Sequence, residues 1–267
     1  MTRRVATTGL FVVNGAVIGA WVSQIPAIQR HFDLSSAAMG LVILCMSVAV
    51  IVAVPVAGQA VARRGSAPVA VGAACLVAVN LPVLAPTPLL LAGGLLLLGA
   101  ASAAMDVGMN SHGVALEGGG TPVMSSLHAG WALGGAAGAA AGAAGAAAGI
   151  DGRVTVALIS ASLAVLLAAC ARHLGEGSAA EGAEAERFTL PSRGVALLAA
   201  LCLLVMLTEG AMADWSGIYM RSDLESGAAV AALSYAVFTA GGDRRRPRGG
   251  PGHPPHRAPA PLRGGGG

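Results

Sequence analysis

Residues 65–105 read GSAPVAVGAACLVAVNLPVLAPTPLLLAGGLLLLGAASAAM, and these 41 residues contain no Asp, Glu, Lys or Arg. A helix needs roughly 20 apolar residues to cross the hydrocarbon core of a bilayer, so this stretch is long enough for two crossings. Proline interrupts a helix, and Leu81-Pro82 together with Pro86-Thr87-Pro88 therefore predicts one helix on either side of this segment. The stretch indicates a helical protein that spans a membrane.

Six other stretches without charged side chains extend this interpretation. They are Val5–Gln29, Leu34–Ala62, Gly118–Ile150, Val154–Ala171, Gly194–Thr208 and Ser226–Gly242. Charged residues make up only 11% of the chain, whereas the helices of a water-soluble domain need a solvated face. We therefore expect an all-helical, polytopic membrane protein. The predicted spans are 5–28, 37–62, two within 65–113, 123–149, 154–171, 194–219 and one that starts near 227.

The arginines of the predicted loops indicate an orientation. Loops on the cytoplasmic side of bacterial membrane proteins carry an excess of basic residues. With the N-terminus in the cytoplasm, the predicted inner loops hold Arg3, Arg4, Arg63, Arg64, Arg172, Arg187 and Arg193, and the outer loops hold Arg30, Arg153 and Arg221. We expect a multi-pass protein of the bacterial cytoplasmic (inner) membrane with a cytoplasmic N-terminus.

One long polar connection divides the chain. Residues 175–192 contain four glutamates and form a predicted cytoplasmic linker between a six-helix bundle (1–174) and a partial second bundle (193–242) with span seven and part of span eight. Six spans followed by a linker and further spans are typical of transporters built from two halves. Residues 243–267 form an Arg/Pro/Gly tail that we expect to be disordered. Because this tail interrupts the eighth span, we expect a truncated or frameshifted product that is inactive by itself.

Ionisable residues inside spans are rare, and each is a functional hypothesis because its desolvation must be offset. Asp106 lies in the fourth span, and Ser102 and Asn110 lie four residues to either side on the same helical face. A structural hydrogen-bond node near the inner interface is the alternative for Asp106. Glu209 in the seventh span suits a proton-coupling role, or it pairs with an arginine of a neighbouring helix.

Two more spans carry polar candidates. Asn14 shares a face of the first span with Trp21 and Gln24, and an aromatic ring beside amides could grip a sugar-like solute, although Trp21 and Gln24 could equally anchor the helix at the membrane surface. His128 in the fifth span could relay protons or bind solute, or lie at the interface. The predicted substrate or proton pathway is Asn14, Asp106, Asn110, His128 and Glu209. Asp214 and Trp215 are predicted interfacial anchors.

Other patterns limit the possible chemistry. The four cysteines lie apart, with no CxxC and no histidine at ligand spacing, and the chain has no phosphate loop or nucleophile–base arrangement. We therefore expect no cofactor, no metal site and no enzymatic activity. The tail arginines are not interleaved with aromatic residues, so nucleic-acid binding is not expected. Glycines at 130, 134, 138 and 142 form a ridge that predicts close helix packing.

Four segments resemble bacterial members of the major facilitator superfamily near its fucose-permease-like branch. They are WVSQIP at 21–26, DVGMN at 106–110, MSSLHAGW at 124–131 and EGAMADW at 209–215. The superfamily's loop motif G-x-x-x-D-R-x-G-R is matched only in part, by Gly58, Arg63 and Gly65, while Ala62 replaces the acid. The Gly-Pro of the antiporter motif is also missing, which favours symport over drug/proton antiport.

The resemblance implies twelve helices in two bundles, a central cavity and alternating access without a covalent cofactor. By position, Asp106 matches an acid that sugar/proton symporters of this kind tend to keep. We therefore expect a proton-coupled secondary transporter of a small polar solute, sugar-like or another metabolite. The alternatives are drug or metabolite efflux by proton antiport and a non-transporting membrane scaffold or receptor. The expected partners are the solute, protons and the lipid bilayer, and the oligomeric state stays open.

Overall fold

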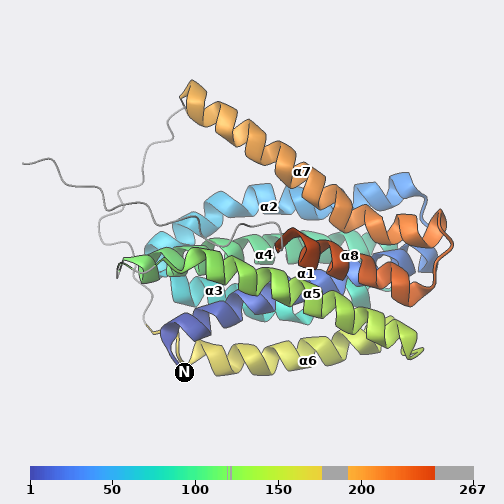
Figure 1. The fold of residues 1–267 in the computed structure, drawn as a ribbon, viewed down its shortest axis with the longest axis horizontal. Helices are drawn as coiled ribbons and strands as arrows, with labels where there is room; N and C mark the ends of the chain where they lie inside the picture. Colours follow the sequence, from blue (N-terminus) through green and yellow to red (C-terminus); the bar gives the residue numbers. More distant parts are fainter. Residues whose placement is uncertain (119, 121, 176–191, 244–267) are drawn as a thin grey trace, which may run out of the picture.

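The protein folds as a set of long helices that lie roughly alongside one another (Figure 1). The computed structural model describes residues 1–118, 120, 122–175 and 192–243. Within these ranges it contains helices and turns and no strand. The elements are α1 (Arg3–His31), α2 (Ser36–Arg64), α3 (Ser66–Val79), the 3-10 helix η1 (Leu81–Leu84), α4 (Pro88–Glu117), α5 (Met124–Ala147), α6 (Gly152–Ala171), α7 (Arg193–Ser222) and α8 (Ala228–Asp243).

Five helices, α1, α2, α4, α6 and α7, are long and apolar enough to cross a membrane. The prediction of an all-helical, polytopic membrane protein is therefore confirmed. The helix bounds also agree with the predicted spans to within a few residues, except that α3, in place of the predicted third span, has only 14 residues. Most of the predicted linker and nearly all of the predicted tail, residues 176–191 and 244–267, lie outside the described residues.

Local chemistry explains where these helices begin and end. The side-chain oxygens of Thr2, Ser35, Thr87 and Ser192 accept hydrogen bonds from backbone N–H groups of the first turns of α1, α2, α4 and α7. The interruption between α3 and α4 begins at Asn80, which adopts a left-handed conformation (φ 47°, ψ 50°). Asparagine tolerates this conformation at a helix end, and Pro82 cannot continue the helix. As a result, α3 has only 14 residues and is too short to cross the bilayer alone.

Helix α1 lies at the centre of the packing, and its most extensive contacts are with α5. A Cβ atom added at Gly134 or Gly138 of α5 would overlap the backbone of Val12 or Ala16 in α1. A Cβ atom at Gly15 of α1 would overlap the backbone of α5 at Trp131. Glycine on both helices therefore lets the two backbones meet, which is the packing that the glycine ridge predicts.

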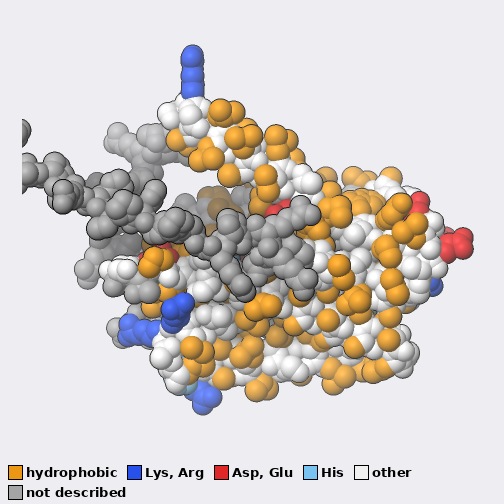
Figure 2. Space-filling model, in the orientation of Figure 1, with side chains coloured by type: hydrophobic (Ala, Val, Ile, Leu, Met, Phe, Trp, Pro, Cys, Tyr) orange, Lys and Arg blue, Asp and Glu red, His pale blue; other side chains and the backbone are white. Residues whose placement is uncertain are grey.

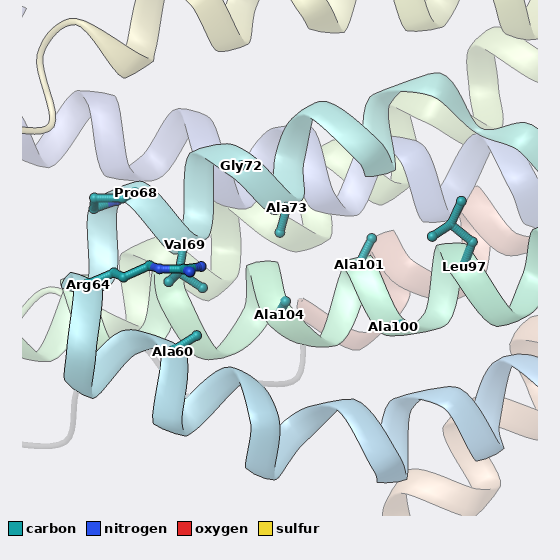
Figure 3. A pocket seen from close by; sticks show the side chains of 10 residues that line it. All are labelled: Ala60, Arg64, Pro68, Val69, Gly72, Ala73, Leu97, Ala100, Ala101 and Ala104. Atoms are coloured by element: carbon teal, nitrogen blue, oxygen red, sulfur yellow. The ribbon is translucent and has the colours of Figure 1, made fainter.

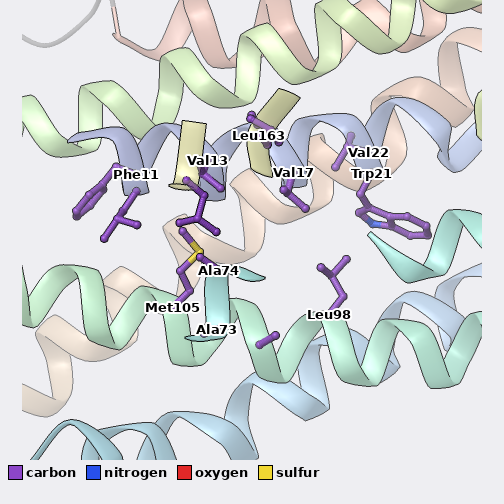
Figure 4. Packing of buried hydrophobic residues seen from close by; sticks show 14 of the residues in the cluster. Phe11, Val13, Val17, Trp21, Val22, Ala73, Ala74, Leu98, Met105 and Leu163 are labelled. Atoms are coloured by element: carbon purple, nitrogen blue, oxygen red, sulfur yellow. The ribbon is translucent and has the colours of Figure 1, made fainter. Parts of the chain in front are cut away.

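The apolar core surrounds the other faces of α1 (Figure 4). Phe11, Val17 and Trp21 of α1 belong to the same buried cluster as Leu98 and Met105 of α4. Trp21 is only 2% exposed, and Gln24 is buried and donates a hydrogen bond to Ser23 Oγ (3.1 Å). The alternative that these two residues anchor the helix at the membrane surface is wrong, because both are packed inside the protein. Their contact with a solute stays a prediction.

The outer helices expose apolar side chains instead of polar ones. None of the most apolar window of α7 is buried, and only 11% of that of α2 is buried. Figure 2 shows hydrophobic side chains spread over the visible face, with most of the charged side chains near helix ends. Such a surface matches hydrocarbon and not water.

Candidate transport site

The polar centre of the fold is Asn14, which is 3% exposed in the middle of α1. Its Oδ1 accepts a hydrogen bond from Trp131 Nε1 of α5 (2.9 Å). Its Nδ2 donates to Ser102 Oγ of α4 at the longer distance of 3.5 Å. An unsatisfied polar group inside a membrane costs several kcal/mol, and here one amide satisfies partners on two other helices. Asn14 therefore ties α1 to both α4 and α5.

Asp106 and Asn110 continue from Ser102 along the same face of α4. Asn110 Nδ2 donates to Asp106 Oδ1 (3.0 Å) and to the Asp106 backbone oxygen (2.9 Å). The side chain of Asp106 is exposed in this structure and forms no ion pair with any described residue. One carboxylate oxygen of Asp106 is thus held by the amide, while the group stays open to a solute or a proton.

His128 approaches this face from α5. Its ring lies edge-on to Phe11 of α1 (centroids 5.4 Å apart, planes at 61°), and its Nδ1 lies 3.0 Å from the backbone oxygen of Met124. Helix α5 contacts both α1 and α4. The structure therefore brings four of the five predicted residues together where α1, α4 and α5 meet.

Glu209 is placed differently. It is exposed on α7, whose most extensive contacts among the described helices are with α8 and α1, and it forms no hydrogen bond or ion pair within the described part of the chain. Tyr235 of α8 is buried and packs near Gly135 of α5. The structure thus does not join Glu209 to the group around Asn14.

Asp214 and Trp215 lie near the C-terminal end of α7. Asp214 is half-buried, and Trp215 is 37% exposed. The ring of Trp215 lies about 3.5 Å from where a Cβ atom of Gly40 in α2 would be. Their role as interfacial anchors stays a prediction.

One residue of the site was not predicted as part of it. Trp131 contributes an indole N–H to the polar groups between helices. Its only signal in the sequence is that it is a polar aromatic residue inside an apolar span, where its N–H needs a partner. No spacing rule links Trp131 to Asn14, because 117 residues separate them.

The site contains no cluster with the character of a metal centre. Within the ranges that the structure describes, no three His, Cys, Asp or Glu side chains gather as metal ligands, and all four cysteines are free thiols. The groups that the site offers are an amide pair, a carboxylate, an imidazole, an indole N–H and a hydroxyl. These groups bind polar solutes and protons by hydrogen bonding.

Comparisons with known proteins agree with this architecture. The chain is 30% identical over 241 residues to an uncharacterized MFS-type transporter of Yersinia pestis and 31% identical over 239 residues to an uncharacterized transporter of Sinorhizobium fredii. It is 29% identical over 240 residues to the membrane protein MosC of Rhizobium meliloti. These matches cover 86–89% of this chain and 56–62% of the relatives, so the chain spans about three fifths of their length. No family model matches the sequence.

Solved structures give the class of fold. The nucleoside transporter NupG (D323A mutant) superimposes with a TM-score of 0.69 at 13% identity, covering 90% of this chain and 65% of NupG. A second NupG structure gives a TM-score of 0.63 at 14% identity. The chain is a multi-pass membrane protein with the fold of major facilitator transporters. Two of these sequence relatives carry transporter names, in agreement with the expectation of a non-enzyme.

Proposed function

We propose that this chain is the solute-binding part of a secondary active transporter for a small polar solute. The observation that supports this most is the hydrogen-bonded group in which Asn14 joins Trp131 and Ser102 beside Asp106. Buried amides and an indole that are fixed by mutual hydrogen bonds form a preorganised polar surface, and preorganisation lowers the entropic cost of binding. The names of the sequence relatives support the same class of function.

We also propose proton coupling through Asp106. Its carboxyl group is exposed and is held on one side by Asn110. Carboxylates inside membrane spans are typical of proton relays, because protonation removes a charge that is costly in low dielectric. Binding of solute beside Asp106 would change the environment of this carboxyl group and so couple solute binding to a proton. We propose the bacterial cytoplasmic membrane as its location, with the N-terminus in the cytoplasm.

Binding can be tested without alternating access. The chain is purified in detergent, and a panel of sugars, nucleosides and other small polar metabolites is screened for a rise in thermal unfolding temperature, as expected for ligands that bind only the folded state. We expect at least one solute to stabilise the protein and Asp106→Asn to abolish its effect. Asp33→Asn is the matched control, since Asp33 lies in a turn with φ 50°, which asparagine also tolerates.

The binding screen has two outcomes that would contradict the proposal. Stabilisation that survives Asp106→Asn removes the assigned role of Asp106, and a panel without any stabilising solute contradicts solute binding.

Uptake into vesicles tests coupling, and a protonophore should collapse this uptake. Substrate export driven by an inward proton gradient would favour antiport instead.

A further inference from the structure

A second hollow lies between α2, α3 and α4, away from the site around Asn14 (Figure 3). Helices α2 and α3 both pack extensively on α4, yet they contact each other only slightly although they are consecutive in the chain. The space between them is therefore a groove whose floor is α4. Its volume is about 380 Å³.

The lining of this groove is apolar except for one side chain. Leu97, Ala101 and Ala104 come from α4, and Val69 and Gly72 come from α3. Small side chains leave the groove open, and they offer no hydrogen-bond partner to a polar solute. Such a surface suits a hydrocarbon chain, which makes only dispersion contacts.

The exception is Arg64, the last residue of α2. Figure 3 shows its side chain extending over Val69 into the groove. It forms no hydrogen bond or ion pair with any other described residue. Arg64 ends a predicted span, so its guanidinium lies at the level of the lipid headgroups. A guanidinium presents parallel N–H donors that match the oxygens of a phosphate.

The groove and the transport site occupy opposite faces of α4. Successive residues of a helix turn by about 100°, so Ala104 lies roughly opposite Ser102 and Asp106. Leu97 and Ala104 are seven residues apart, so the floor of the groove extends about 10 Å along α4. The groove therefore leads from the charged end at Arg64 toward the middle of the membrane, and it does not join the polar face.

We propose that this groove binds an anionic phospholipid, with its phosphate at Arg64 and one acyl chain along α4. The groove is complementary to such a lipid. The cation Arg64 lies at the level of the phosphate, and the apolar lining lies at the level of the acyl chain. Basic residues near the membrane surface attract anionic lipids by about 1 kcal/mol each, which corresponds to roughly fivefold in occupancy.

The test uses phosphatidylglycerol that carries a photoreactive diazirine in one acyl chain, mixed into phosphatidylcholine vesicles that contain the protein. After irradiation, peptide mapping should place the label on α3 and on residues 97–104 of α4. Arg64→Gln should lower this labelling roughly fivefold. Arg63→Gln is the matched control, because Arg63 is the neighbouring cation but does not line the groove.

A second pair of variants tests the apolar part. A Cβ atom at Gly72 meets nothing within 4 Å, so Gly72→Leu should extend into the groove without disturbing the fold and should abolish labelling. Gly93 of α4 is also open but lies outside the groove, and Gly93→Leu should label as the wild type does. Unlabelled phosphatidylglycerol should compete, whereas phosphatidylcholine and inorganic phosphate should not.

Several results would overturn the proposal. Equal losses in Arg64→Gln and Arg63→Gln would mean general surface attraction and not a site. Labelling that persists in Gly72→Leu, or competition by phosphatidylcholine as strong as that by phosphatidylglycerol, would also contradict it. A cross-link from the groove to a second copy of the chain, in place of lipid, would assign the groove to a protein partner.

Discussion

Helices α1 and α7 have nearly equal lengths, 29 and 30 residues, but opposite environments. In their most apolar windows, α1 has a mean hydropathy of 1.7 and is 72% buried, whereas α7 has a mean hydropathy of 2.2 and none of its window is buried. The less apolar helix is thus the more buried one. In a water-soluble protein, the hydrophobic effect would favour the reverse.

The difference in burial between α1 and α7 follows from the lipid bilayer, which is the solvent of these helices. Lipid tails are as apolar as leucine, so apolar area gives a membrane helix no reason to prefer protein over lipid. Helix α1 carries Gly15 and Asn14, which allow close backbone contact and interhelical hydrogen bonds. Helix α7 carries a run of large aliphatic residues at 203–207, and its Gly210 meets no neighbouring atom within 4 Å. Small residues and polar contacts therefore decide which helix is central, and the following predictions test that explanation.

The largest expected effect comes from Gly138→Leu. A Cβ atom at this position overlaps the backbone of Ala16 in α1, and a backbone cannot rotate away as a side chain can. We expect the free energy of unfolding to fall by about 3 kcal/mol or more, measured by thermal or denaturant unfolding in detergent. Gly210→Leu on α7 is the control, because nothing lies within 4 Å of its Cβ position. Similar losses in the two variants would contradict the role of the ridge.

A smaller effect is expected from Trp131→Phe. This change removes the indole N–H and leaves Asn14 Oδ1, inside the protein, without its 2.9 Å donor, which should cost about 1–2 kcal/mol. Combining it with Asn14→Leu in a double-mutant cycle should give a coupling energy of about 0.6–1.5 kcal/mol. Strictly additive effects would mean that the two side chains do not stabilise each other in the membrane protein.

The smallest effect is expected on α7. Leu204 is 61% exposed, so Leu204→Ala removes few contacts within this chain. The unfolding free energy should change by less than about 0.5 kcal/mol, in the same detergent assay. A loss of 2 kcal/mol or more, as large-to-small changes cause in a packed core, would show that α7 is buried against protein.

The sequence predicted the helices well, because charge-free stretches and prolines such as Pro82 act locally. It also predicted Asn14, Asp106, Asn110 and His128, which the fold brings together, although their roles stay proposals. The prediction that Trp21 anchors α1 at the membrane surface was wrong. A period of 3.6 residues places side chains on one face of a helix but does not show what that face contacts. Pairs such as Asn14 and Trp131 depend on which helices are neighbours, and this information lies in tertiary packing.

The central claim is that the polar face of α4 lines an aqueous route, while its opposite face contacts lipid. The experiment starts from a variant whose four native cysteines are replaced. Single cysteines are then introduced at Asp106 or Asn110 on the polar face and at Leu97 or Ala104 on the opposite face. Each variant is treated in membranes with a hydrophilic thiol reagent. The thiolate is the reactive form, and it is suppressed in apolar surroundings. We predict rapid labelling at 106 and 110 and little labelling at 97 and 104. Protection at 106 and 110, or equal reaction at all four positions, would contradict the proposed route.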